Sequence, residues 1–164
     1  MLPLVSFVGH HNSGKTTILR DVISNLSAAG VRIALIKHAH HTLNIEPYKD
    51  SEILLQAGAD FVIASSPHLS MQYQRHEKAP DFADIVENIP VGIDLIIVEG
   101  FKKEALPKIE VLRRETDSEP MLLPQTIALI SDFPIQTEIP VFDNNDIKGI
   151  TRFMIDYLGI KQQG

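Results

Sequence analysis

The sequence has no cysteine, no strong positive charge and no long apolar run. Without cysteine, the chain cannot form a disulfide, use a thiolate nucleophile or build a cysteine metal site. A membrane span needs roughly 20 apolar residues in a row. The apolar N-terminus has no basic leader, so we do not interpret it as a signal peptide. The formal net charge of −6 provides no general field for nucleic acid or anionic lipid. We therefore expect a cytoplasmic protein with neither nucleic-acid nor membrane partners.

The chain is long enough for one self-supporting core, and its composition is that of an ordinary globular protein. It shows no internal repeat, low-complexity tract or long linker. We expect a single nucleotide-binding domain over residues 1–164, for the reasons given next.

The most informative stretch is Gly9-His10-His11-Asn12-Ser13-Gly14-Lys15-Thr16, which fits the pattern G-x-x-x-x-G-K-[ST]. A short apolar segment, residues 4–8, precedes it and is typical of a buried strand. Apolar residues at helical spacing follow it over residues 18–26. Strand, glycine loop and helix are the context that a phosphate-binding loop requires.

The residue types in this loop suit a nucleoside triphosphate. Gly9 and Gly14 allow the backbone to bend and approach a ligand closely. The loop N–H groups and the helix N-terminus then face an anion together. Lys15 would bridge the β- and γ-phosphates, and the Thr16 hydroxyl would bind Mg²⁺. A glycine-rich turn that binds nothing is the simpler alternative.

Strand and helix patterns alternate along the rest of the chain, which predicts an α/β fold with a mainly parallel sheet flanked by helices. A helix is expected over residues 15–29 and a strand over residues 31–36. A helix begins at Asp50, strands 60–65 and 69–75 form a hairpin, and a strand is expected over residues 139–142. Pro140 favours an edge or the start of that strand. A last helix reaches about Leu158.

A second informative stretch is the apolar run of residues 95–98, which predicts a strand buried on both faces. Glu99 follows at its carboxyl end. In phosphate-loop enzymes an acid in this position helps to hold Mg²⁺ or its water, so we predict this role for Glu99. A solvated loop carboxylate is the alternative.

Together these motifs resemble the MobB family of molybdopterin-guanine dinucleotide biosynthesis adapter proteins. The resemblance covers nearly the whole chain and rests on the phosphate loop with Thr17, Lys37-His38-Ala39-His40-His41, Asp50-Ser51-Glu52, Ala57-Gly58-Ala59, Val98-Glu99-Gly100-Phe101-Lys102 and Pro107-Lys108-Ile109-Glu110. It implies a P-loop NTPase-type three-layer fold, a homodimer, and GTP binding with Mg²⁺. It also implies at most slow GTP hydrolysis and support of MobA, the guanylyltransferase that attaches GMP to molybdopterin.

The resemblance also implies roles for individual residues. Those expected to bind nucleotide phosphates or Mg²⁺ are Gly9, Asn12, Ser13, Gly14, Lys15, Thr16 and Thr17. The acids expected on the metal side are Asp50 and Glu99. Asp50 alternatively serves as a helix N-cap.

Five of the seven histidines lie at residues 10–11 and 38–41. Such a tract can bind a transition metal, but the sequence offers no clear further ligand. Contact with an anionic ligand, including the pterin, is the stronger interpretation for Lys37, His38, His40, His41 and Lys102. Lys108 is a further candidate for a phosphate contact, and a solvated cluster is the alternative for all of them.

Base selectivity and hydrolysis are weakly encoded. The Asn-Lys-x-Asp motif of ordinary GTPases is missing, and Asp132, after a predicted strand, is a positional candidate for reading guanine. Its alternative is a turn aspartate. No arginine finger or water-positioning residue is evident. An ATP-dependent small-molecule kinase and a metal-binding metallochaperone NTPase therefore remain as competing functions.

Overall fold

The computed structural model describes residues 2–39, 50–116 and 119–161, which form two compact units. The first unit comprises residues 1–38 and 89–164, and the second comprises residues 39–88. The second unit is therefore inserted between two parts of the first. The expectation of one nucleotide-binding domain over the whole chain stays a prediction. The predicted phosphate loop and the strand ending at Glu99 belong to the first unit.

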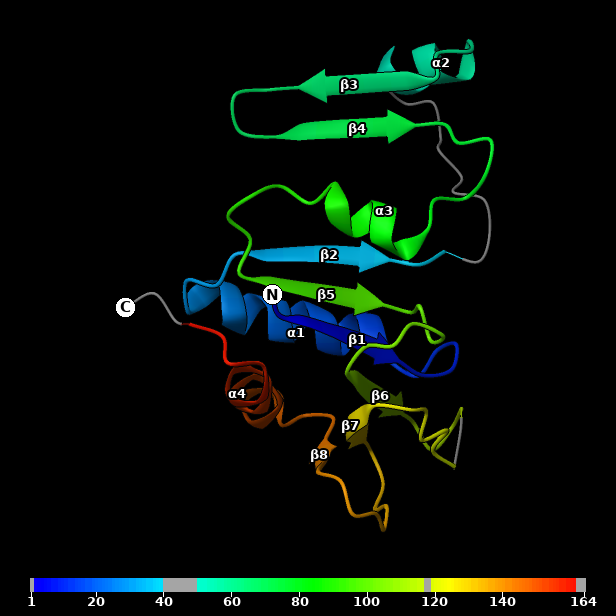
Figure 1. The fold of residues 1–164 in the computed structure, drawn as a ribbon. Coiled ribbons are helices and arrows are strands. Elements are labelled where there is room, and N and C mark those ends of the chain that lie inside the picture. The colour runs from blue at the N-terminus through cyan, green and yellow to red at the C-terminus, as the bar shows by residue number, and fades with distance from the viewer. Residues whose placement is uncertain (1, 40–49, 117–118, 162–164) are drawn as a thin grey trace. The chain divides into compact units, whose positions relative to one another are not determined.

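In its described residues, the first unit contains six strands and two helices (Figure 1). In chain order they are β1 (Leu4–Val8), α1 (Lys15–Ala28), β2 (Ile33–Lys37), β5 (Leu95–Glu99), β6 (Lys108–Leu112), β7 (Thr126–Ser131), β8 (Val141–Asp143) and α4 (Ile147–Leu158). The helix at residues 15–29 and the strand at residues 31–36 were thus predicted within two residues of their ends. In the described part of the chain, no helix has the length and apolar character needed to cross a bilayer.

The six strands form one sheet in the order β2-β5-β1-β6-β7-β8, and all neighbouring strands are parallel. This confirms the predicted α/β fold with a parallel sheet flanked by helices. Strand β8 lies at an edge and begins directly after Pro140, as the proline predicted. Because the strands run the same way, their carboxyl ends share one edge of the sheet, where α/β proteins bind ligands (Figure 1).

One face of this sheet packs against α1 and α4. Its inward residues are apolar and include Phe7, Ile97 and Ile130, which join the buried side chains of the two helices in one core. Met154 and Ile150 of α4 are fully buried there, whereas Tyr157 is half exposed. The apolar stripe of α4 was therefore predicted correctly except at its last residue.

On the opposite face, the strands β1, β6 and β7 carry a mixture of apolar and polar buried residues. Ser6, Lys108, Glu110 and Ser131 are each at most 3% exposed. The pairing register places Ser6 beside Lys108, and Val8 beside Glu110. The described residues of the links from β5 to β6 and from β6 to β7 contain no helix, although each link joins parallel strands. These two links, residues 100–107 and 113–125, are called the first and second crossover below.

The second unit contains α2 (Asp50–Gln56), β3 (Phe61–Ser65), β4 (Ser70–Gln74) and α3 (Phe82–Glu87). Strands β3 and β4 form the predicted antiparallel hairpin, with Phe61 beside Gln74 and Ser65 beside Ser70. Tyr73 donates a hydrogen bond of 2.7 Å to the buried Glu52 of α2, which fixes the helix on the hairpin. Phe61 and Ile63 are exposed on the hairpin, at 49% and 56% of their surface.

Candidate functional site

The predicted phosphate loop connects the carboxyl end of β1 to the first residue of α1. Three of its residues have positive φ, namely Gly9 at 152°, Asn12 at 62° and Gly14 at 88°. At Gly9 a Cβ would lie 2.4 Å from the Val111 carbonyl oxygen of β6, so a side chain cannot be accommodated. The loop is thus seated directly on the backbone of the neighbouring strand, which is a structural reason for glycine there.

Lys15 extends along the loop from the first turn of α1. Its ammonium group donates to the carbonyl oxygens of Gly9 at 3.3 Å and His10 at 2.5 Å, and to the Ser13 hydroxyl at 3.2 Å. Burial lowers the pKa of Lys15, and the nearby charges of Lys102 and Lys37 lower it further, while Glu99 opposes the shift. A partly desolvated ammonium among other cations is prepared to bind an anion.

Glu99 lies at the centre of the site, at the carboxyl end of β5. The Thr16 hydroxyl donates to its Oε1 at 3.3 Å, and the Lys37 ammonium lies 3.2 Å from both carboxylate oxygens. Lys37 reaches Glu99 because the two residues are register partners in β2 and β5. The Glu99 side chain is only 12% exposed. A hydroxyl and a carboxylate side by side are hard oxygen ligands, so this pair fits Mg²⁺.

The segment after Glu99 turns sharply over the end of β2. A Cβ on Gly100 would lie 3.0 Å from the Cβ of His38, and Gly100 has a φ of 100°. Phe101, with a φ of 51°, stacks its ring on His38 with 4.4 Å between centroids. Lys102 follows, and its ammonium group lies 3.6 Å from the Met121 sulfur. His38 therefore lies against an aromatic ring beside the cationic cluster.

The structure brings Thr16, Glu99 and Lys37 into contact, with Lys15 adjoining Thr16 and Lys102 three residues after Glu99. Their roles at a ligand stay predictions. Thr17 is exposed in the first turn of α1, and Ser13 is buried beneath Lys15. Asp50 begins α2 in the second unit, and its role at a metal stays a prediction. His40 and His41 lie outside the described residues. Among the residues described, no three histidine, aspartate or glutamate side chains gather as a metal site.

Asp132 follows β7 at the same edge of the sheet. Its Oδ1 accepts a hydrogen bond of 2.8 Å from the Arg114 backbone N–H, and the Arg114 guanidinium lies 5.1 Å from the centre of the Phe133 ring. Asp132 also lines a hollow of about 280 Å³ between the ends of β7 and β8. One oxygen of Asp132 thus anchors a turn, and its role in reading guanine stays a prediction.

The prediction that Lys108 meets a phosphate is wrong. Its side chain is 1% exposed and donates to three backbone carbonyl oxygens and the Gln125 side chain. The sequence pattern predicted no role for Phe101 or Glu110. The sequence pattern that could have indicated this arrangement is the alternation Lys108-Ile109-Glu110-Val111, which places two charged residues on one face of an otherwise apolar strand.

A parallel sheet, with a glycine loop before its first helix and an acid at the end of the neighbouring strand, places the molecule in the class of α/β proteins. The family model described as molybdopterin guanine dinucleotide synthesis protein B matches residues 4–132. The chain belongs to this family, whose curated members include adapter proteins of molybdopterin-guanine dinucleotide biosynthesis.

Individual relatives agree with this assignment. The molybdopterin-guanine dinucleotide biosynthesis adapter protein of Escherichia coli K12 is 34% identical over 171 aligned residues, covering 100% of this chain and 97% of that protein. The Haemophilus influenzae protein of the same name is 31% identical and covers 96% of this chain and 90% of its own. A crystal structure of molybdopterin-guanine biosynthesis protein B superposes with a TM-score of 0.78 at 25% identity, covering 94% and 99% of the two chains.

Proposed function

We propose that this protein binds Mg²⁺–GTP at its phosphate loop and acts as an adapter for a MobA-type guanylyltransferase in molybdopterin-guanine dinucleotide biosynthesis. The observation that carries the nucleotide part is the 3.3 Å contact between Thr16 and Glu99 beside Lys15. Thr16 and Glu99 come from distant parts of the chain, and together they supply the two oxygen ligands that a phosphate loop needs for Mg²⁺.

Each residue has a distinct part in this proposal. The loop N–H groups and Lys15 bind the β- and γ-phosphates, and Thr16 and Glu99 hold the cation. The cation supplies charge neutralisation for the triphosphate. Lys37 and Lys102 provide further positive charge for a γ-phosphate or for the phosphate of a bound pterin. The hollow beside Asp132 is the candidate position for the base.

The adapter part rests on the relatives named above rather than on a residue. Adapter function agrees with the sequence, in which no arginine finger or water-positioning residue is evident. Without such a group, hydrolysis is expected to be slow. A homodimer and a cytoplasmic location complete the proposal, and the exposed Phe61 and Ile63 of the hairpin favour an apolar contact between copies.

Calorimetric titration with Mg²⁺–GTP and Mg²⁺–ATP tests the nucleotide part. We expect GTP to bind more tightly than ATP. The Lys15→Ala variant should bind GTP at least about 100-fold more weakly, because several charge-assisted hydrogen bonds are lost. Lys148→Ala, which removes an exposed lysine from α4, is the matched control and should bind like the wild type.

Other outcomes select among the competing functions. A preference for ATP with turnover only when a hydroxylated acceptor is supplied would favour a small-molecule kinase. Stoichiometric Ni²⁺ or Zn²⁺ binding that is lost in the His38→Ala/His40→Ala double variant would favour a metallochaperone. Equal GTP binding by wild type and Lys15→Ala would contradict the proposed phosphate site. Once GTP binding is established, co-purification with a MobA-type enzyme tests the adapter part.

A further inference from the structure

We propose that Lys108 and Glu110 are positioning residues of the nucleotide site, which hold the two crossovers over β6 and thereby fix Lys102 at the end of the sheet where Glu99 meets the phosphate loop. The inference rests on the proposed function and goes beyond it, because neither residue is expected to touch the nucleotide. It concerns the Pro107-Lys108-Ile109-Glu110 motif, whose two charged side chains are buried away from the predicted ligand.

Lys108 connects the end of the first crossover to the end of the second. Its ammonium group donates to the carbonyl oxygens of Glu104 at 2.7 Å and Leu106 at 3.2 Å. It also donates to the carbonyl oxygen of Pro124 at 3.1 Å and reaches the Gln125 side chain at 3.5 Å. One buried ammonium thus satisfies carbonyl groups that a loop, unlike a helix, leaves unpaired.

Glu110 provides the acceptors for backbone N–H groups of the second crossover. Its two carboxylate oxygens accept hydrogen bonds from the N–H groups of Met121 at 2.7 Å and Leu122 at 3.0 Å. The Glu110 side chain is fully buried. Because Lys108 and Glu110 are two residues apart in one strand, they point to the same face of the sheet and bind the second crossover at two points.

The crossovers are held in a backbone conformation that they would not adopt unaided. Four non-glycine residues in the described chain have positive φ, namely Asn12, Phe101, Leu122 and Gln125. Asn12 is in the phosphate loop, and the other three are in the crossovers. Leu122 is bonded by Glu110, and Gln125 adjoins Lys108. Such strain persists only where surrounding contacts determine it, and it gathers at functional sites.

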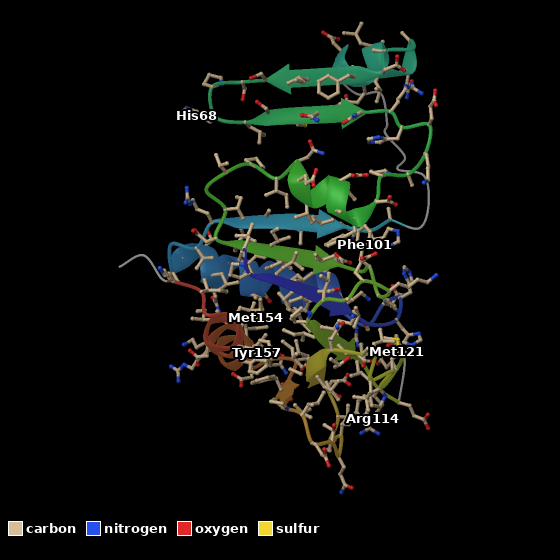
Figure 2. The ribbon with its side chains drawn as sticks, viewed as in Figure 1. His68, Phe101, Arg114, Met121, Met154 and Tyr157 are labelled. Atoms are coloured by element: carbon tan, nitrogen blue, oxygen red, sulfur yellow. The ribbon has the colours of Figure 1, made fainter. Side chains whose placement is uncertain are left out.

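Lys102 connects the crossovers to the phosphate loop. It belongs to the first crossover and contacts Met121 of the second, whose N–H is the one bound by Glu110. Lys102 also lies three residues after Glu99, whose Oε1 contacts the Thr16 hydroxyl at the start of α1, and the phosphate loop itself rests on β6 at Val111. Figure 2 shows Phe101 and Met121 at the edge of the sheet to which the strand arrows point. Strand β6 therefore supports the loop directly and Lys102 indirectly.

A double-mutant cycle separates positioning from general stability. The four proteins are wild type, Lys102→Ala, Lys108→Met and the double variant, each titrated with Mg²⁺–GTP. We expect Lys102→Ala to weaken binding about tenfold, as for one lost charge-assisted hydrogen bond. Lys108→Met should weaken it similarly. The double variant should be no weaker than Lys102→Ala, because Lys108 acts through Lys102.

Two controls keep the result interpretable. Met154→Ala makes a cavity on the helix-covered face and should lower stability without changing the affinity for GTP. Hydrogen exchange should show that Lys108→Met loses amide protection in the two crossovers, while α4 keeps it. If Lys108→Met does not fold, Glu110→Gln replaces it in the same cycle, because an amide retains the shape but turns a donor toward one of the two N–H groups.

Additive losses in the cycle, an unchanged affinity in Lys102→Ala, or an unchanged affinity in a folded Lys108→Met protein would each overturn the inference while leaving GTP binding intact. Failure of the wild type to bind GTP would overturn the proposed function as well. The two failures are therefore distinguishable in one set of titrations.

Discussion

The two faces of the parallel sheet differ in the polarity of their buried side chains. The face beneath α1 and α4 is apolar, with Phe7, Ile97, Ile109 and Ile130 among its buried residues. The face beneath the crossovers carries a buried serine, lysine and glutamate along β1 and β6. The same strands supply both faces, because successive residues alternate between them.

The difference follows from what covers each face. A helix pairs nearly all of its own N–H and carbonyl groups, so the strand residues below it need only be apolar and well packed. An irregular crossover leaves such groups unpaired, and each one costs free energy when it is buried. Ser6, Lys108 and Glu110 provide the missing partners through side chains. The buried charges therefore reflect the missing crossover helices.

The largest predicted effect is a loss of stability caused by a substitution on the helix-covered face. Met154→Ala removes a fully buried side chain and should lower the free energy of unfolding by about 2–5 kcal/mol. Urea denaturation measures this loss, and calorimetry should show unchanged GTP binding. A parallel loss of GTP affinity in the folded variant would mean that the helix-covered face is not separate from the site.

A pair of hydroxyl deletions compares the faces directly. The Ser6 hydroxyl donates to the Gly100 carbonyl oxygen at 2.6 Å, whereas the Thr151 hydroxyl donates to the carbonyl of Ile147 one turn earlier in its own helix. Ser6→Ala should destabilise by about 1–2 kcal/mol, since the Gly100 carbonyl loses this donor. Thr151→Val should cost less than about 0.5 kcal/mol, because that carbonyl keeps its helical partner. Equal losses in the free energy of unfolding, measured by urea denaturation, would contradict the proposed difference between the two faces.

The smallest effect concerns Lys15, at the sheet edge where the phosphate loop lies. Its pKa is lowered mainly by burial, so the folded state holds the proton less strongly than the unfolded state. Keeping Lys15 charged therefore destabilises the fold at neutral pH. Lys15→Met should slightly raise the midpoint of thermal unfolding while abolishing GTP binding.

The pH dependence of the Lys15→Met effect provides its check. The gain in stability should be complete below the lowered pKa of Lys15, where Lys15 is charged in both the folded and the unfolded protein. It should shrink as the pH rises to the ordinary pKa of a lysine, because above that pH Lys15 is neutral in both states and no buried charge is left to remove. A gain that grows with pH would contradict this account. Lys148→Met is the matched control and should show no such trend, because Lys148 is exposed.

How far the sequence predicts the molecule depends on whether an interaction is local. The turn before α1, the strand ending at Glu99 and the hairpin of β3 and β4 were predicted because each is encoded by neighbouring residues. The convergence of Lys37 on Glu99 also follows from a general rule, that the carboxyl ends of parallel strands share one edge.

The rest depended on long-range contacts that no local pattern specifies. Lys108 was a candidate for a phosphate contact, with simple exposure as the alternative because lysines are rarely buried. Its carbonyl partners instead lie in two segments whose course could not be predicted. Strand order was unpredictable for the same reason. In helix α2 the pattern did not identify the buried side either, since Glu52 and Leu55 are buried while Ile53 and Leu54 are half exposed. The buried Glu52 depends on Tyr73, which lies in another element.

The order of the strands also sets when the phosphate loop can form during translation. Strand β1 is made first, but its two partners are β5 and β6, with Leu4 beside Ile96 and Ser6 beside Lys108. The ribosome must therefore complete the inserted unit and β6 before Gly9 of the loop can pack against the Val111 carbonyl group. Contacts so distant in sequence slow folding. A nascent chain that ends before β6 carries the whole glycine-loop motif without the strand that supports it, so the ligand proposed for this loop can stabilise the fold only late in synthesis.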